Sequence, residues 1–236
     1  RRYLNDDSFT DPVALKQLQP TPADQVILKD KSDYRVLNFS EGNPFNETSN
    51  RTAYFHQSVG GYNPAKLHRF QDLIDRKIAQ EIKTFAAYIN DAEGDMLNTK
   101  YVIFGNRENQ VVMNPYANGN GWFVGKIDFA KDADAEMLAV QTLDTKSAAV
   151  ADERFRQVLD GSPLDSGSVE LKTREANKIT YEVTTGRGGV AVFSEVYYPG
   201  WEASIDGKPS ELGRVNYILR AMRIPAGKHV VELRYE

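Results

Sequence analysis

The last 45 residues of the chain, 192–236, consist of short alternating segments joined by turn residues. From Trp201 to Ile205 apolar and polar side chains alternate, which is the period of a β-strand with one buried face. Asp206-Gly207 follows, a dipeptide that readily adopts the positive φ angles of a two-residue hairpin turn. A second turn at residues 225–228 precedes another alternating segment, His229 to Tyr235. The pattern predicts consecutive antiparallel strands, as in a β-sandwich.

The first two thirds of the chain mix helical and extended patterns. Apolar residues recur at steps of three and four from Leu67 to Ile89, which predicts a long amphipathic helix from Pro64 to about Asn90. Strands are expected at residues 34–39, 96–104, 110–114 and 122–129, and short extended pieces at 25–28 and 148–150. Shorter helices are expected at residues 11–18, 132–143 and 152–159. This mixture is typical of an α+β fold.

A glycine- and serine-rich stretch at residues 161–167 separates the two kinds of pattern and is interpreted as a linker. We therefore predict two domains with a boundary near residue 166. Residues 1–166 form a mixed α/β domain with one long amphipathic helix, and residues 167–236 form an antiparallel β-sandwich. The predicted fold class is α+β.

Composition excludes several classes of function. The chain of 236 residues is 41% hydrophobic and 26% charged, as expected for a water-soluble globular protein. Its formal net charge is -4 without any basic run, so nucleic acid is not an expected partner. No apolar run approaches the ~18 residues needed to cross a bilayer. The sequence has no cysteine, which excludes disulfides and thiol catalysis.

Several short motifs occur in the order found in one protein family. They are Tyr197–Trp201, Ile205–Lys208, Asn216–Tyr217 and Ile224–Gly227, together with Arg2–Asp7, Tyr54–Tyr62, Leu97–Ile103 and Gly121–Val124. As a set they resemble the C-terminal part of bacterial YfhO-family membrane proteins. Each motif is short, but the set extends over almost the whole chain.

The resemblance implies a location and a role. Members of the family are polytopic and glycosyltransferase-like, and transfer a sugar from a lipid-phosphate donor outside the membrane. Their essential carboxylate lies in an early extracytoplasmic loop, which would be outside this sequence. By resemblance this chain is the large extracytoplasmic domain, on the periplasmic or cell-surface side, tethered between late transmembrane helices. Its implied partners are those helices and a surface glycan or lipid-linked sugar.

One candidate binding surface is the loop that contains His56, Tyr62, Asn63 and Lys66. Gly60-Gly61 in this loop would let the backbone approach a ligand closely. A tight turn that leads into the helix at Pro64 explains the same residues, and we favour that simpler interpretation.

A second, weaker candidate surface is Tyr198 with Trp201, on either side of Pro199-Gly200. Aromatic rings can cover the apolar face of a sugar while polar neighbours select its hydroxyl groups. Trp201, however, begins an alternating strand, so packing in the core is the favoured interpretation. Trp122 is expected in the core as well.

No catalytic residue, metal site or cofactor is predicted. Two groups of acidic residues, 128–136 and 91–95, are interpreted as helix caps and solvated surface. The three histidines lack the spacing of a zinc site. The alternatives to a binding domain are a self-contained glycan hydrolase, which needs two convergent carboxylates, and a purely structural interaction module.

Overall fold

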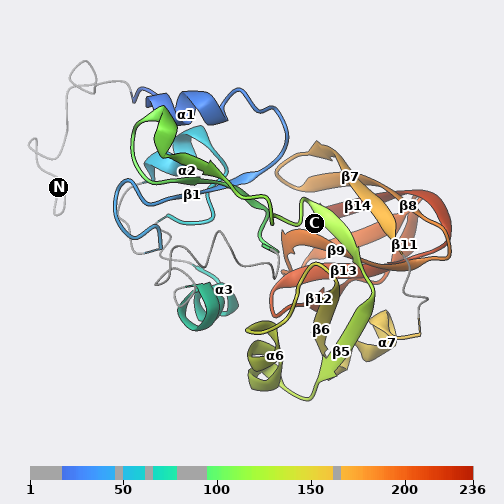
Figure 1. The fold of residues 1–236 in the computed structure, drawn as a ribbon. Helices are drawn as coiled ribbons and strands as arrows, with labels where there is room; N and C mark the ends of the chain where they lie inside the picture. Colours follow the sequence, from blue (N-terminus) through green and yellow to red (C-terminus); the bar gives the residue numbers. More distant parts are fainter. Residues whose placement is uncertain (1–17, 46–49, 62–65, 79–94, 162–165, 236) are drawn as a thin grey trace, which may run out of the picture.

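The computed structural model describes residues 18–45, 50–61, 66–78, 95–161 and 166–235. It combines helices with several largely antiparallel sheets, which confirms the predicted α+β class and the β-rich C-terminal region. Figure 1 shows a small sheet with two short helices beside a larger β-rich body.

The small sheet has three strands. β1 (Arg35–Asn38) is parallel to β2 (Thr99–Ile103), and β2 is antiparallel to β3 (Val111–Met113). These strands lie within three of the predicted extended segments. Ile27, Val36 and Ile103 form the centre of a small core beneath α1 (Pro22–Ile27). Asp33, just before β1, and Arg35 at its start contact the larger body through Arg174 and Glu195.

Residues 25–28 were expected to be extended, but the structure places them in and next to α1. Thr21 and Asp24 form a capping box, in which the Thr21 hydroxyl accepts from the Asp24 N–H at 3.2 Å. The Asp24 carboxylate accepts in turn from the Thr21 N–H at 2.7 Å. Pro22 at the first position of the helix also suits a helical start. These local signals outweigh the weak β propensity of Val26 and Ile27.

The predicted long helix is described only in part. Residues 68–78 form α3 (His68–Leu73), which continues as a π-helical turn, Ile74–Ile78. Leu73, Ile74 and Ile78 are buried against the main core, as the apolar spacing predicts. Pro64 itself lies outside the described residues, but Leu67 is extended, so α3 begins at His68 rather than at Pro64 as predicted. Residues 79–90 and residues 11–17 of the predicted helix 11–18 lie outside the described residues. The short helix α2 (Arg51–Phe55) precedes α3 in the chain.

Two sheets form the larger body. The first has the strand order β11-β10-β14-β8-β7 and is antiparallel throughout. Its strands are β7 (Gly167–Arg174), β8 (Lys178–Thr185), β10 (Trp201–Ile205), β11 (Lys208–Ser210) and β14 (Gly227–Tyr235). Asp206 and Gly207 between β10 and β11 have φ angles of 52° and 76°, which confirms the predicted hairpin turn.

The second sheet has the order β4-β9-β13-β12-β6-β5, and only the pair β5 and β6 is parallel. Its strands are β4 (Gly121–Val124), β5 (Lys126–Ala130), β6 (Ala148–Asp152), β9 (Gly189–Val196), β12 (Gly213–Val215) and β13 (Leu219–Ile224). Alternate residues of β9 and β13, including Phe193 and Met222, face the first sheet and complete a sandwich core with Tyr181 and Val231.

The single strand predicted at residues 122–129 is two strands. Gly125 interrupts it, and β4 and β5 occupy opposite edges of the same sheet. Consecutive Cα atoms are only ~3.8 Å apart, so the sheet must curl until its two edges meet at this residue. The N–H of Gly125 donates to the carbonyl of Ser147 at 2.8 Å and holds the corner in place.

The second sheet is built from both sides of the predicted domain boundary. Strands β4, β5 and β6 precede residue 166, whereas β9, β12 and β13 follow it. Strand β4 pairs with β9, and β6 pairs with β12. The two-domain division stays a prediction, and any separation near residue 166 would have to break these pairings.

Two predicted short helices are present beside this sheet. They are α6 (Ala133–Val140) and α7 (Arg156–Leu159), the latter preceded by a 3₁₀ turn at Glu153–Phe155. Met137 and Val140 of α6 are buried against the sheet. None of the described helices has the length and apolar character needed to cross a bilayer.

Candidate functional site

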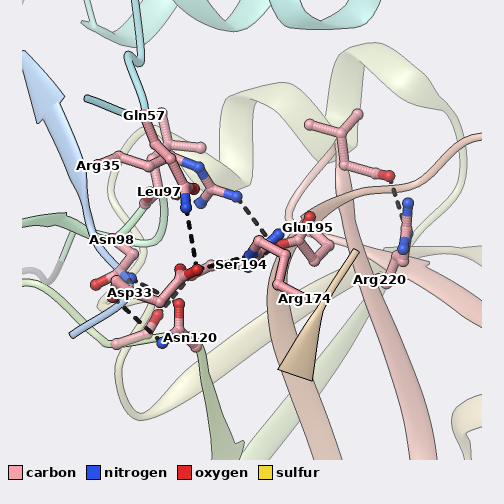
Figure 2. Close-up of polar contacts among 12 residues, drawn as sticks. Asp33, Arg35, Gln57, Leu97, Asn98, Asn120, Arg174, Ser194, Glu195 and Arg220 are labelled. Atoms are coloured by element: carbon pink, nitrogen blue, oxygen red, sulfur yellow. Dashed lines mark hydrogen bonds and ion pairs between the residues drawn. The ribbon is translucent and has the colours of Figure 1, made fainter. Parts of the chain in front are cut away.

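Four charged side chains connect the small sheet to the sandwich. The Glu195 carboxylate on β9 accepts from Arg35 at 3.0 Å and from Arg174 at 2.6 Å. Arg174 also donates to Asp33 at 2.7 Å. Figure 2 shows the contacts of Arg35 and Arg174 meeting at Glu195, with Arg174 between Glu195 and Asp33. The bonds join residues that are 21 to 160 positions apart in sequence, so only the tertiary fold assembles the cluster.

Neighbouring polar groups fix the position of Asp33. Its carbonyl oxygen accepts from the amides of Asn98 and Asn120, both at 3.3 Å, and Gln57 donates to its carboxylate at 3.0 Å. The two asparagines also bond to each other at 2.9 Å. Because each amide has two partners, the cluster has little freedom to rearrange.

Arg220 on β13 lies beside this cluster and is only 3% exposed. Its Nε donates to the Val196 carbonyl at 3.0 Å, and its guanidinium lies 3.9 Å from the centre of the Trp201 ring. Its Nη1 has no hydrogen-bond partner among the described residues. Burial lowers the pKa of Arg220 to about 10, since the interior disfavours the charged form more than Glu195 supports it.

A cavity of about 440 Å³, here called the central pocket, opens above these side chains. Its walls come from the Gly60-Gly61 loop, from the start of α3, and from β9 with the loop that follows it. The charged or aromatic lining residues are Arg35, Lys66, Phe70, Glu195, Tyr198, Trp201 and Arg220. The volume falls within the range of ligand sites for small molecules, ~300–1,000 Å³.

The central pocket brings the two predicted surfaces together. Gly60, Gly61 and Lys66 of the first surface line the same cavity as Tyr198 and Trp201 of the second. The Lys66 ammonium donates to the Phe45 carbonyl at 3.3 Å. A Cβ on Gly60 would collide with the Pro44 carbonyl, so only glycine lets the loop pass this close. Tyr62 and Asn63 lie outside the described residues.

Tyr198 and Trp201 differ in their surroundings. Tyr198 is 45% exposed, whereas Trp201 is half-buried and packs against the sandwich core. Trp201 also lies against Tyr235, with ring centres 5.8 Å apart. One part of the Trp201 ring therefore packs against the core, and another part lines the central pocket. Trp122 is buried, as expected, and donates to the Thr145 carbonyl at 2.8 Å.

A second cavity of about 540 Å³, here called the side pocket, adjoins the first. The two share four lining residues, Leu67, Phe70, Val196 and Tyr198. The side pocket is further lined by the aromatic rings of Phe155 and Tyr197 and by the arginines at positions 69, 154 and 214. Together the central and side pockets form one groove that follows α3.

Comparison with known proteins relates the C-terminal part of the chain to one protein family. Residues 140–236 match the family model described as bacterial membrane protein YfhO. This match confirms the resemblance over those residues, which extend from the end of α6 to the end of the chain. No curated protein and no solved structure matches the chain.

The YfhO match begins upstream of the predicted domain boundary and includes β6, which pairs with β12. It contains Glu195, Tyr198, Trp201 and Arg220, whereas Lys66 and the rest of the Gly60-Gly61 wall lie before it. The YfhO segment therefore supplies one wall of the central pocket, and residues that precede it supply the other.

His56, a predicted binding residue, lines neither the central pocket nor the side pocket. Its imidazole is fully buried, with Nε2 3.1 Å from the Asp24 carboxylate. Burial lowers the pKa of His56, and Asp24 only partly compensates. Arg51 also donates to Asp24, at 2.8 Å, so the three side chains connect α1 to α2. In this structure the contacts of His56 are those of a structural residue.

The acidic group at 128–136 includes one residue that sequence reasoning interpreted incorrectly. Asp132 caps α6 as expected, accepting from the Ala135 N–H at 2.8 Å. Glu136, expected on the solvated surface, is fully buried and accepts from Arg214 at 2.7 Å. Glu136 also accepts from the N–H of Tyr217, whose φ of 71° is uncommon for a bulky residue. The sequence signal for this burial was the position of Glu136 beside Met137 and Val140, on the apolar face of α6.

Chemical groups for catalysis or metal binding are sparse in the described part of the chain. No group of three or more metal-ligating side chains occurs there. Glu195 is the one carboxylate among the lining residues of the two pockets, and it is already paired with two arginines. The acids at positions 91 and 93 lie outside the described residues.

Proposed function

We propose that the groove binds a glycan, and that this chain is the extracytoplasmic, non-catalytic recognition domain of a membrane-bound, glycosyltransferase-like protein. The groove would hold the acceptor glycan or the lipid-linked sugar while the transfer reaction takes place near the membrane. The protein's own transmembrane helices would be its permanent partners. The match to a family of bacterial membrane proteins supports the membrane context.

One observation carries this proposal. Lys66 and the Gly60-Gly61 turn of the first predicted surface line a single cavity with Tyr198 and Trp201 of the second. An exposed phenol ring, a half-buried indole and several charged hydrogen-bonding groups surround the same space. Aromatic faces with a few convergent polar groups are the usual composition of a small-molecule site.

Hydrolysis is the weaker alternative. A glycosidase needs two carboxyl groups ~5–10 Å apart across the bound sugar. Within the described residues neither pocket presents such a pair, because Glu195 is the sole acid in the lining and two arginines occupy it. The geometry favours binding over bond cleavage.

Titration of the chain with an array of bacterial surface glycans tests the proposal. We expect at least one glycan to bind, and Tyr198→Ala to weaken it roughly tenfold, because truncating a central aromatic contact typically costs more than 1 kcal/mol. The conservative Trp201→Phe should weaken binding less while keeping the sandwich core packed. Both effects can be measured by isothermal titration calorimetry.

Tyr54→Ala is the matched control, since Tyr54 is 68% exposed and lines neither pocket. Its affinity should equal that of the unaltered chain. Binding of no glycan in the array, or equal losses in Tyr54→Ala and Tyr198→Ala, would contradict a glycan site in the groove. Release of free sugar during the titration would favour the hydrolase alternative.

A further inference from the structure

Arg220 carries a charge that its surroundings do not fully compensate. Glu195, the one acid in the lining of the central pocket, already accepts from Arg35 and Arg174 through the same oxygen, Oε1. Arg220 itself bonds to a neutral carbonyl and lies over an indole ring, and its Nη1 is without a partner among the described residues. A buried cation in such a place is costly unless an anion comes near.

The lining of the central pocket has the same imbalance. Arg35, Lys66 and Arg220 contribute three positive charges, whereas Glu195 contributes one negative charge. Lys66, on the opposite wall from Arg220, bonds to a backbone carbonyl rather than to an acid. The chain as a whole has a net charge of -4, so this local excess is the reverse of the overall balance. A cavity with such walls concentrates the potential of its cations.

The side pocket continues the positive lining. Its three arginines face two carboxylates beneath them: Arg214 is 2.7 Å from Glu136 and 3.6 Å from Asp152, and Arg69 is 3.6 Å from Glu136. Arg214 is 3% exposed, and its Nε has no partner among the residues that the structure describes. Each half of the groove therefore has a buried guanidinium with an unused donor.

We propose that the groove recognises an acidic glycan, with a negatively charged sugar substituent held in the central pocket between Lys66 and Arg220. This inference rests on the proposed glycan-binding function and specifies its ligand class. The sugar ring lies against Tyr198 and Trp201, and the adjoining sugar units of the glycan extend past Tyr198 into the side pocket. Charge-assisted hydrogen bonds to the anion supply the selectivity against neutral glycans.

The sharpest test compares acidic oligosaccharides with their own methyl esters, which keep the sugar skeleton and remove the charge. Oligouronates of several sugar types serve as probes, each titrated into the chain beside its ester. We expect at least one acid form to bind about tenfold or more tightly than its ester, with the difference shrinking as salt rises and screens the charges. Inorganic phosphate alone and a single-stranded oligonucleotide complete the set of probes.

Variants locate the site. Lys66→Met, at the partly exposed rim of the pocket, should reduce the preference for the acid form several-fold, because it weakens binding of the acid more than binding of the ester. Arg220→Gln should do the same, and its folding is checked by its unfolding temperature because Arg220 packs beneath Trp201. Lys146→Met removes an exposed lysine that lines neither pocket and should change nothing.

Each outcome decides between the two proposals. If acids and esters bind equally, the proposed function stands and the acidic ligand is refuted. If phosphate or the oligonucleotide binds as tightly as the best saccharide, the groove is an anion site but not a glycan site. If no acid or ester binds although a glycan of the array does, the proposed function stands and the acidic ligand is refuted. If nothing in either set binds, both proposals fail. If the Lys66→Met and Arg220→Gln variants fold and keep an unchanged preference for the acid form, the acidic group does not bind in the central pocket.

Discussion

Tyr181 shows at the scale of one residue how burial and hydrogen bonding can conflict. The side chain is completely buried beside Phe193, yet its hydroxyl has no partner among the described residues. Burial raises the pKa of Tyr181, because the phenolate would be still less favourable there. A buried hydroxyl without a partner costs stability that a phenyl ring of the same shape avoids.

We therefore expect Tyr181→Phe to leave stability unchanged or raise it by up to about 1 kcal/mol, because the desolvation cost of the hydroxyl disappears. Urea unfolding followed by tryptophan fluorescence measures the change. Tyr217→Phe is the contrasting variant, since the Tyr217 hydroxyl donates to Asp72 at 2.9 Å and its loss should destabilise. A clear loss of stability in Tyr181→Phe would show that its hydroxyl is bonded after all.

His229 gives a second prediction at this scale, through its contact of 2.7 Å with Asp206. The bond to Asp206 raises the pKa of His229 above its ordinary value of 6.5. A raised folded-state pKa means that the pair stabilises fully below about pH 6.5 and loses this effect as pH rises through the folded-state value. We therefore expect His229→Gln to be less stable than the unaltered chain below about pH 6.5, and the difference to vanish as pH rises through the folded-state pKa of His229.

Asp206→Asn is the matched variant, since asparagine also accepts the left-handed backbone of residue 206. Both single variants should flatten the same part of the curve of unfolding free energy against pH, and the double variant should add nothing further. His56 acts in the opposite sense, because its lowered pKa makes stability fall on acidification. If either single variant kept the full pH dependence of the unfolding free energy, the His229–Asp206 pair would not be the origin of that dependence.

At the scale of elements, two loops depend on glycine to different degrees. Gly60 approaches the Pro44 backbone too closely for any side chain, whereas a Cβ on Gly125 would lie 3.6 Å from the Ser147 carbonyl, an ordinary contact. Gly60→Ala must therefore displace the loop that forms one wall of the central pocket. Gly125→Ala should be accepted at the corner between β4 and β5.

We expect Gly60→Ala to destabilise the protein by about 1–3 kcal/mol, as overpacking commonly does, and to weaken glycan binding. Gly125→Ala should cost less than about 1 kcal/mol, mainly because a strand corner tolerates a small side chain. Thermal unfolding together with the calorimetric titration measures both variants. Equal effects in the two glycine variants would mean that the close approach at Pro44 relaxes freely.

At the scale of the whole molecule, the shared sheet bears on the predicted boundary near residue 166. If residues 167–236 were cut off alone, β9 and β12 would each lose the neighbour on their outer edge. Arg174 and Glu195 would lose Asp33 and Arg35 as partners. Exposed strand edges favour aggregation. We expect this piece to be poorly folded or aggregated, as judged by the dispersion of its amide NMR signals.

A piece that starts at residue 95 and keeps β4, β5 and β6 is the control, because it retains both pairings. We expect its NMR spectrum to show better dispersion than that of residues 167–236. A well-dispersed spectrum from residues 167–236 alone would support the predicted division and contradict the expectation of a shared folding unit.

The proposed side of the membrane can be tested because the sequence contains no cysteine. Leu138→Cys, at a position 69% exposed, should react with a membrane-impermeant maleimide added to intact cells that carry the full-length protein, with any other cysteines replaced. Ala149→Cys, at a buried position, should react only after denaturation. Labelling of Leu138→Cys only after cell lysis would place the domain on the cytoplasmic side.

The sequence alone determined the local features of this protein. Alternation identified β10 and β14, the Asp206-Gly207 dipeptide indicated a hairpin turn, and three- and four-residue spacing identified the helical segment around α3. Local motifs also indicated the family, which the match over residues 140–236 supports. These signals depend on residues a few positions apart in sequence, so they can be recognised without knowledge of the fold.

The tertiary structure alone decided which distant residues meet. No local sequence pattern predicts that Arg35 and Glu195, 160 positions apart, form an ion pair, or that Lys66 and Trp201 line the same cavity. It also decided that Glu136 is buried and that one predicted strand divides at Gly125. Such outcomes depend on how sheets curl and pack, and a pattern of period two or 3.6 specifies only which face is apolar, not what covers it.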